Sequence, residues 1–323
     1  MKIGIIGLGY WGEKILNKLI PLFGKDIVIC DTNQKKLHDL LNLYSLNPSG
    51  CYQDFRFMLD MACIDAVIIT TPAETHYEIA SEAIKAHKHI FIEKPLCLQI
   101  DNVDALSDQV KLFGKIFFIN HVYLHSNCIR FIKSLIDNNA LGTKIHYFHS
   151  IRTNLGAYRK HNVVWDLGPH DLSIIKYLFK DYIVSEIKAT CHSNYSPLEQ
   201  GIQDTAFINI SFFNDFSASI FLSWCYPKKI RDVVIMGNTS GIIYENNNRV
   251  IVFKHNLCSP FKLTNIKKDI IEEYTQEDDP LTNSLNSFLD CIKKNTLPPI
   301  GSSIDFAKEI INLLSLSQNP LLS

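Results

Sequence analysis

An ammonium group and a carboxylate stand together where one apolar run of this sequence ends. The tripeptide Glu93-Lys94-Pro95 directly follows the run 89–92, which is HIFI. Proline disfavours a helical conformation in the residue before it, so Lys94 is expected to be extended. A lysine held in this way can hydrogen-bond a hydroxyl group and stabilise negative charge developing on its oxygen. The residues alone also allow a surface ion pair between Glu93 and Lys94.

A carboxylate and an imidazole form a second group in the segment 165–171, which is WDLGPHD. Asp166 and His170 are four residues apart, so on a helix they share one side. A carboxylate near the imidazole favours the protonated ring and orients it, as a general base requires. The alternative is structural. Asp166 then caps a helix that begins near residue 167, and Asp171 only interacts favourably with the dipole of the first turn.

A glycine-rich turn, Gly7-Leu8-Gly9-Tyr10-Trp11-Gly12, lies between the apolar run 2–6 and a helical pattern over 11–20. A G-x-G-x-x-G turn between a strand and a helix is typical of dinucleotide binding. The first glycine permits the tight turn, the second lets a pyrophosphate approach the backbone, and the third lets helix and strand pack closely. The N–H groups at the start of the helix attract the phosphates. We therefore expect Gly7, Gly9 and Gly12, with Tyr10 and Trp11 between them, to bind a dinucleotide.

Asp31 ends the second apolar run and predicts which dinucleotide is bound. A carboxylate there accepts hydrogen bonds from the adenosine ribose and repels a 2′-phosphate, which favours NAD over NADP. Thr71, Pro72 and His76 follow the third run, where loops line the ligand crevice, and they are further candidate cofactor contacts. Thr71 and Pro72 also suit the start of a helix, which is compatible with cofactor contact.

Strands and helices that position these groups alternate from the N-terminus to about residue 119. The expected strands are 2–6, 27–30, 64–70, 89–92 and 116–119, and the expected helices are 11–20, 33–43, 76–88 and 101–113. Because the strands are apolar on both faces, they predict a parallel sheet covered by helices, a doubly wound Rossmann domain over 1–119. Glu93 and Lys94 then join the cofactor contacts at the carboxyl edge of this sheet.

The pattern changes after residue 120, where strands follow one another without helices between them. The expected strands are 145–152, 184–192, 204–213, 216–225, 230–236 and 249–253, and the expected helices are 126–138, 167–178, 281–294 and 303–316. Consecutive strands predict an open, mainly antiparallel sheet. We therefore expect an α+β domain over 120–323, with C-terminal helices that pack back on the first domain.

Composition narrows the classes of partner. The 323 residues carry a formal net charge of -1, and no basic stripe or long apolar run predicts binding to nucleic acid or insertion into a membrane. The nine cysteines are scattered, odd in number and without a C-x-x-C pair, so neither disulfides nor a metal site are expected. Reduced thiols indicate a cytoplasmic protein.

The glycine turn, the Glu93-Lys94-Pro95 tripeptide and the Asp166–His170 pair, in this order, resemble the glucose–fructose oxidoreductase/inositol dehydrogenase/MocA (Gfo/Idh/MocA) family. The resemblance covers essentially the whole chain. It implies oxidation or reduction of sugars, cyclitols and related compounds with NAD or NADP. It also implies dimers or tetramers built through the second sheet, and catalytic roles for Lys94, Asp166 and His170.

A narrower resemblance lies just before the catalytic helix, in Arg152, Asn154, Arg159 and Asn162. These residues are similar to the branch that oxidises the C3 hydroxyl of UDP-N-acetylglucosamine or its uronic acid, before amination, in making 3-amino sugars for lipid A and other surface glycans. Guanidinium groups suit a diphosphate and amides suit the sugar. An inositol or free-sugar dehydrogenase and a non-catalytic NAD-dependent sensor stay open as alternatives. The residues also leave open whether Lys94 or His170 is the base.

Overall fold

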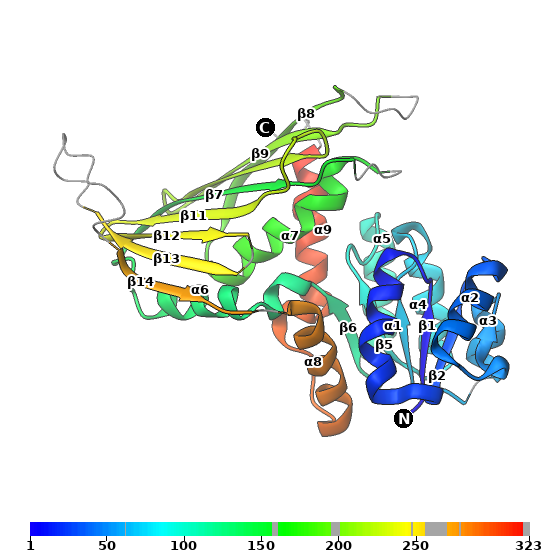
Figure 1. Cartoon of the computed structure of the whole chain (residues 1–323). Helices are drawn as coiled ribbons and strands as arrows, with labels where there is room; N and C mark the ends of the chain where they lie inside the picture. Colours follow the sequence, from blue (N-terminus) through cyan, green and yellow to red (C-terminus); the bar gives the residue numbers. More distant parts are fainter. Residues whose placement is uncertain are drawn as a thin grey trace. The chain divides into compact units, whose positions relative to one another are not determined.

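The chain divides into two compact units, each with its own sheet (Figure 1). The computed structural model describes residues 1–61, 63–156, 161–194, 201–246, 248–255, 270–277 and 279–318. The first unit comprises Met1–His121 and Leu281–Ile311, and the second comprises Val122–Pro280 and Asn312–Ser323. No helix in the described ranges has the length and apolar character needed to cross a membrane.

The first unit is built on a six-stranded parallel sheet with the order β3-β2-β1-β4-β5-β6. Its strands are β1 (Ile3–Ile6), β2 (Ile27–Cys30), β3 (Cys51–Tyr52), β4 (Ala66–Ile69), β5 (His89–Glu93) and β6 (Phe117–Asn120). Its helices are α1 (Tyr10–Phe23), α2 (Gln34–Tyr44), α3 (Phe55–Met61), α4 (His76–Lys85), α5 (Ile100–Lys111) and α8 (Pro280–Lys294), with short 3-10 turns η1 (Gly24–Asp26), η2 (Pro48–Gly50), η3 (Ala73–Thr75) and η6 (Ile300–Ser302). The chain direction across the sheet reverses between β1 and β4, which is where open α/β sheets bind ligands.

Helix α8 packs on this sheet although it lies far along the chain. Phe91 of β5 and Phe118 of β6 stack with ring centroids 5.4 Å apart, and Phe288 of α8 meets both rings edge-on. Ser284 of α8 also donates a hydrogen bond of 2.7 Å to Asn120. Aromatic pairs of this kind contribute about 0.5–1.5 kcal/mol beyond the area they bury.

The second unit holds an eight-stranded sheet with the order β14-β13-β12-β11-β7-β10-β9-β8. The strands are β7 (Ile145–Thr153), β8 (Val184–His192), β9 (Thr205–Phe212), β10 (Ser217–Ser223), β11 (Arg231–Gly237), β12 (Ser240–Glu245), β13 (Arg249–Lys254) and β14 (Ile270–Thr275). Where the structure describes this sheet, only β7 and β10 pair in parallel, and the other neighbours are antiparallel. The turn η4 (Val122–His125) leads to α6 (Asn127–Asp137), which packs on β13, and α7 (Val163–Leu178) packs on β7, β9 and β10; the last helix, α9 (Ile304–Gln318), has its final turns in this unit.

The predicted fold class, a doubly wound parallel sheet followed by a mainly antiparallel one, is confirmed. Among the strands and α-helices of the described residues, those not predicted are β3, α3, β12 and β14. The helix expected over 167–178 begins four residues earlier, at Val163, because the side chain of Asn162 caps it by accepting a hydrogen bond from the Trp165 backbone N–H at 3.2 Å. Asp166 therefore lies in the first turn and is not the N-cap.

A buried histidine makes the stability of the protein depend on pH. His125 is 2% exposed, and its burial, with a smaller effect from the charge of Arg130, lowers its pKa to about 4. An unfolded chain binds this proton near pH 6.5, so stability is complete above that pH and falls as the pH drops toward 4, by about 3 kcal/mol in all. We expect His125→Asn to flatten the dependence, measured as urea midpoints between about pH 7 and about pH 5. The same exchange at exposed His38 is the control, and equal slopes in all three proteins would contradict the prediction.

Candidate functional site

The glycine turn has the geometry that a dinucleotide requires. Gly7 adopts a φ of +87°, which favours glycine, and its N–H donates to the Cys30 carbonyl at 2.8 Å. A Cβ added to Gly12 would lie 2.0 Å from the Gly7 carbonyl oxygen, so helix and strand pack too closely for any side chain. A Cβ at Gly9, by contrast, would meet no protein atom within 4 Å. The backbone is thus open where a pyrophosphate approaches the start of α1, and these residues fit NAD.

This contrast predicts different results for two alanine substitutions. Gly9→Ala should leave the unfolding midpoint almost unchanged but weaken NADH binding at least about tenfold, because the methyl group fills the space that the pyrophosphate needs. Gly12→Ala should lower both, because its Cβ collides with backbone. Fluorescence titration with NADH and thermal unfolding check both variants. Unaltered NADH affinity in Gly9→Ala would place the pyrophosphate elsewhere.

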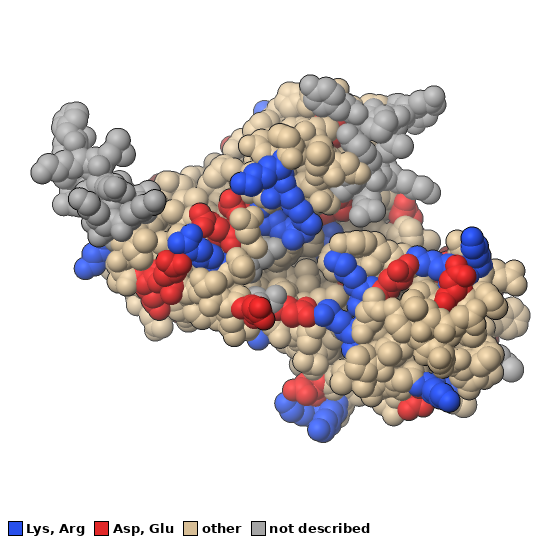
Figure 2. All heavy atoms as spheres, in the orientation of Figure 1, with Lys and Arg blue, Asp and Glu red and all other residues tan. Residues whose placement is uncertain are grey.

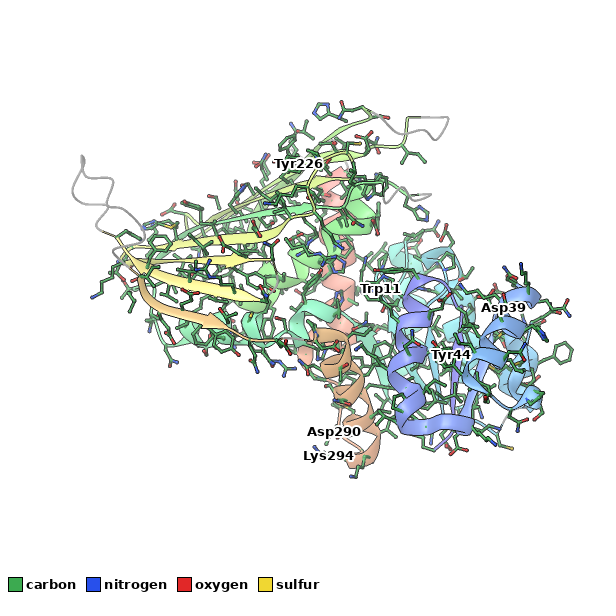
Figure 3. All side chains as sticks on the ribbon, viewed as in Figure 1. Trp11, Asp39, Tyr44, Tyr226, Asp290 and Lys294 are labelled. Atoms are coloured by element: carbon green, nitrogen blue, oxygen red, sulfur yellow. The ribbon has the colours of Figure 1, made fainter. Side chains whose placement is uncertain are left out.

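The aromatic residues inside the turn project from the first turn of α1, where Figure 3 labels Trp11. Tyr10 and Trp11 meet edge-to-face with centroids 5.6 Å apart, and Tyr10 is 61% exposed. The ammonium of Lys14 lies 4.3 Å from the Tyr10 ring centroid and 5.2 Å from that of Trp11. This cation, which was not predicted from the sequence, lies about one helical turn from the glycines that are expected to bind the phosphates.

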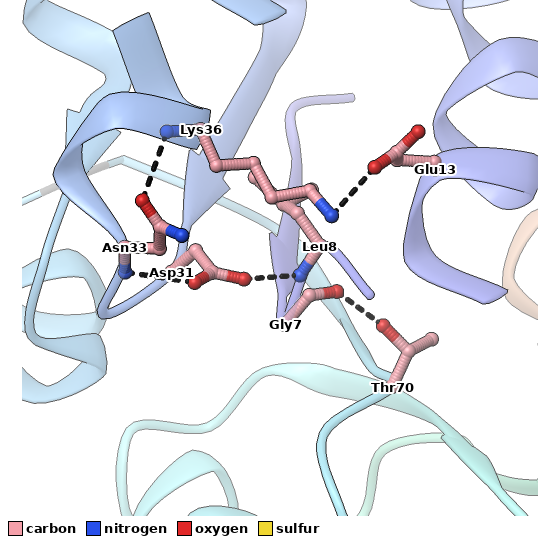
Figure 4. Close-up of polar contacts among 7 residues, drawn as sticks. All are labelled: Gly7, Leu8, Glu13, Asp31, Asn33, Lys36 and Thr70. Atoms are coloured by element: carbon pink, nitrogen blue, oxygen red, sulfur yellow. Dashed lines mark hydrogen bonds and ion pairs between the residues drawn. The ribbon is translucent and has the colours of Figure 1, made fainter. Parts of the chain in front are cut away.

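Asp31 ties the glycine turn to the start of α2 (Figure 4). One carboxylate oxygen accepts a hydrogen bond of 2.6 Å from the Leu8 N–H, and the other accepts one of 2.9 Å from the Asn33 N–H. On the other side of the turn, the Thr70 hydroxyl donates to the Gly7 carbonyl. Asp31 therefore lies beside the backbone of the glycine turn, and its contact with the adenosine ribose stays a prediction.

His76 has a different use from the one predicted. Its side chain is 1% exposed, and its Nε2 and Nδ1 lie 2.9 Å from the carbonyl oxygens of Thr71 and Pro95. Burial is the main cause that lowers its pKa. With both ring nitrogens turned to backbone, His76 is not placed to contact a cofactor. It instead joins the loop after β4, which contains Thr71 and Pro72, to the loop after β5, which contains Lys94.

Glu93 and Lys94 differ in environment although they are neighbours. Glu93 is 8% exposed and accepts a hydrogen bond of 2.7 Å from the Asn120 side chain, while burial raises the pKa of its carboxyl group. Lys94 is half-buried at the end of β5, and its peptide bond to Pro95 is cis. The simple surface ion pair is thus excluded for Glu93. Glu93 binds Asn120, which in turn accepts a hydrogen bond from Ser284, and its contact with the cofactor stays a prediction.

The helix α7 holds both remaining catalytic candidates. The Trp224 indole N–H donates a hydrogen bond of 3.0 Å to the Asp166 carboxylate. His170 is 8% exposed, and the Tyr123 ring meets its imidazole at 89° with centroids 4.8 Å apart. Both side chains are therefore held by aromatic residues of the second unit. Lys94 belongs to the first unit, so its meeting with His170 at one reacting hydroxyl stays a prediction.

Arg152, which the sequence predicts as a contact for the substrate diphosphate, is buried in an ion pair. It is 3% exposed, and its Nε and Nη2 donate hydrogen bonds of 2.6 and 3.1 Å to the two carboxylate oxygens of Asp171. The guanidinium also lies 4.4 Å from the centroid of the Tyr123 ring, which is the ring that packs edge-to-face with His170. This buried ion pair corrects two predictions: that Arg152 binds the diphosphate, and that Asp171 only interacts with the dipole of the first helical turn. Asp171 lies beyond the first turn of α7 and neutralises Arg152. Arg152 in turn packs on the Tyr123 ring that contacts His170.

The three other residues predicted to contact the substrate through this segment have different outcomes. Asn162 caps α7 and donates a hydrogen bond of 3.1 Å to Gln203, so its amide has structural partners. Asn154 is half-buried and remains a prediction. Arg159 lies outside the described residues.

Two exposed lysines, Lys228 and Lys229, lie beside the end of β7 and were not predicted from the sequence as substrate contacts. The Thr153 hydroxyl donates to the Lys228 carbonyl at 2.5 Å and accepts from the Ile230 N–H at 2.8 Å, so the sequence Lys228-Lys229-Ile230 runs alongside the strand end that carries Asn154. The adjacent basic pair is a visible signal, but only the pairing of β7 with β11 places it here. On the face drawn in Figure 2, basic and acidic side chains are interspersed.

Two family descriptions match successive parts of the chain. Residues 1–121 match "Oxidoreductase family, NAD-binding Rossmann fold", and residues 129–243 match "GFO/IDH/MocA C-terminal domain". A solved structure of UDP-N-acetylglucosamine 3-dehydrogenase GnnA from Acidithiobacillus ferrooxidans has a TM-score of 0.80 and 19% sequence identity, covering 98% of this chain and 96% of that one. At this identity the structural likeness shows a shared fold.

Two curated relatives match over a smaller share of the chain. Glucose-6-phosphate 3-dehydrogenase of Bacillus subtilis (strain 168) is 24% identical, over 69% of this chain and 68% of that enzyme. Inositol 2-dehydrogenase of Azotobacter vinelandii (strain DJ / ATCC BAA-1303) is 26% identical over 57% of this chain, and the match spans little more than half of that enzyme, 56%. The family matches, by contrast, follow both units in order. The chain therefore belongs to the Gfo/Idh/MocA family of oxidoreductases, and its first unit is the NAD-binding domain of that family.

Proposed function

We propose that this protein is an NAD-dependent dehydrogenase that oxidises the C3 hydroxyl of UDP-N-acetylglucosamine, or of its uronic acid, to a 3-keto sugar. The observation that carries the proposal is the arrangement on α7, where Trp224 holds the Asp166 carboxylate and Tyr123 packs against the His170 imidazole. A fixed imidazole in an NAD-binding oxidoreductase suits removal of a hydroxyl proton. This arrangement also speaks against a non-catalytic NAD sensor.

In the proposed mechanism each side chain has one task. NAD, held by Gly7, Gly9, Gly12 and Asp31, supplies the hydride acceptor when bound. Lys94 hydrogen-bonds the substrate hydroxyl and stabilises the negative charge that grows on its oxygen. His170 takes the hydroxyl proton, and Asp166 stabilises the imidazolium that results. The protein thus contributes mainly position and charge.

The choice of a sugar nucleotide rests on the segment 152–162 and its surroundings. Because Asp171 neutralises Arg152, we assign the diphosphate instead to the exposed pair Lys228 and Lys229, together with Arg159. Two of the similar proteins are named as 3-dehydrogenases of a phosphorylated or nucleotide-linked sugar, which agrees with oxidation at C3. The alternative within the family is an inositol or free-sugar dehydrogenase, which the match to inositol 2-dehydrogenase favours.

A substrate panel followed by the absorbance of reduced nicotinamide tests the proposal. It contains UDP-N-acetylglucosamine, its uronic acid, glucose 6-phosphate, inositols and free hexoses. We expect the two UDP-sugars to give the highest kcat/KM. Replacing Lys228 and Lys229 by alanine should raise KM for them about tenfold, because two phosphate contacts are lost. The pair Lys293 and Lys294 at the end of α8 is the control. High rates with inositol alone would sink the proposal, and tight NAD binding without turnover of any compound would favour the sensor.

We also propose, as the family resemblance implies, a cytoplasmic homodimer or homotetramer assembled through the second sheet. Along β9, exposed residues alternate with buried ones, and Phe207 is 46% exposed. Its ring lies 4.9 Å from that of Phe221 on β10, and Phe221 meets Tyr226. An aromatic group of this kind on an open sheet suits an interface. Light scattering should show an oligomer that Phe207→Glu dissociates, whereas a monomeric wild type would remove the proposal.

A further inference from the structure

Two more charged side chains, Lys36 and Glu13, lie near Asp31 beside the glycine turn (Figure 4). Lys36 lies in the first turn of α2, where its backbone N–H donates a hydrogen bond of 3.1 Å to the side chain of the N-cap residue Asn33. Its ammonium reaches back to α1 and lies 2.5 Å from a carboxylate oxygen of Glu13, the residue after Gly12. The Lys36 and Glu13 side chains are 29% and 44% exposed. The two helices that frame the turn are thus joined by an ion pair.

The position of this pair matters for the adenosine end of the cofactor. A carboxylate at the end of the second strand of such a domain binds the adenosine ribose, and a nearby basic residue is what accommodates the 2′-phosphate of NADP. Asp31 holds the Asn33 and Leu8 N–H groups, so the ribose position lies between the glycine turn and the first turn of α2. Lys36 stands at that turn, whereas Lys35 is exposed on the helix. Lys36 is therefore the basic residue best placed to receive a 2′-phosphate.

Glu13 opposes that use in two ways. It holds the Lys36 ammonium, and it adds a second carboxylate to that of Asp31, so the group of three side chains carries a net negative charge. A 2′-phosphate would have to displace Glu13 from Lys36 and would meet both carboxylates. The two hydroxyls of the NAD ribose carry no charge and are not repelled.

We propose that Glu13 is a specificity-determining residue that makes this site reject NADP by occupying Lys36. The inference rests on NAD binding by the first unit and is independent of the proposed sugar substrate. It predicts that neutralising Glu13 releases Lys36 for the 2′-phosphate. The Asp31 carboxylate remains in that variant, so the preference is reduced and not inverted.

The test is a set of equilibrium titrations with NADH and NADPH, without any sugar. In Glu13→Gln, the ratio of the Kd for NADPH to that for NADH should fall about tenfold, mainly through tighter NADPH binding, as expected for one charge-assisted phosphate contact. Adding Lys36→Gln should restore the wild-type ratio. Glu82→Gln is the matched control, because it breaks the Glu82–Lys85 pair on α4 with the same change of charge.

Competition by 2′,5′-ADP and by 5′-ADP repeats the comparison with probes that differ only in the 2′-phosphate. Equal NADPH/NADH ratios in Glu13→Gln and Glu82→Gln would overturn the inference. A lowered ratio that persists in the double variant would overturn it as well, because Lys36 would then not be the recipient. Failure of the wild-type protein to bind NADH would remove its premise. Failure of the substrate panel alone leaves these binding results unaffected and concerns only the proposed substrate.

Discussion

Lys94→Met is expected to lower kcat for the preferred substrate at least about 10²-fold, the usual scale for a group that handles a proton or its charge. Methionine keeps most of the length of the side chain but cannot donate a hydrogen bond. The negative charge that grows on the substrate oxygen then has no ammonium to stabilise it. Because Lys94 is half-buried at the end of β5, water replaces the ammonium poorly.

The kinetic pattern separates this role from a structural one. Steady-state kinetics should show the loss mainly in kcat, with a smaller change in the Kd for NADH, since the glycine turn and Asp31 are intact. Lys115→Met, at an exposed lysine before β6, is the control for loss of one ammonium near the same sheet. Turnover by Lys94→Met within about twofold of this control would remove Lys94 from the mechanism, because a catalytic ammonium is not dispensable on that scale.

The sequence predicts the first unit well because its signals are local. Five of its strands coincide with short, mostly apolar runs whose composition predicts burial on both faces: β1, β2, β4, β5 and β6. The strand β3 has only two residues, so no periodicity could reveal it. The edge strand β14 is largely exposed, and its pairing with β13 is what makes it a strand. A strand that forms because of its partner leaves no pattern in its own segment from which it could be predicted.

The same distinction separates the site residues whose surroundings are set by local sequence from those whose surroundings depend on distant partners. The glycine turn and Asp31 are recognisable because their spacing is set within a single β-α-β unit. The use of Arg152 depends on Asp171, nineteen residues away along the chain. The partner of Asp166 is Trp224, separated from it by 58 residues. A cation or a carboxylate can be recognised in a sequence, but whether a second group neutralises or orients it is a property of the fold.

His170→Ala is expected to lower kcat/KM at least about 10²-fold, because it removes the proposed base. The fold should persist, and the edge-to-face contact with Tyr123 that the substitution removes is worth about 0.5–1.5 kcal/mol. Thermal unfolding checks the fold, and His192→Ala, at an exposed position on β8, is the control. The decrease of kcat/KM on the acid side, which protonation of an imidazole base produces, should be absent from the His170→Ala profile.

A comparison with Trp224→Phe makes this assignment sharper. Phenylalanine preserves an aromatic ring in the fully buried position of Trp224 but removes the N–H that binds Asp166. If Asp166 acts by orienting and stabilising the imidazolium, the acid-side decrease should remain in Trp224→Phe, shifted in pH, with a smaller loss of rate than in His170→Ala. An unchanged acid-side decrease in His170→Ala would show that the proton goes to another group. Lys94 would then be the base, because it is the other side chain assigned to the substrate hydroxyl.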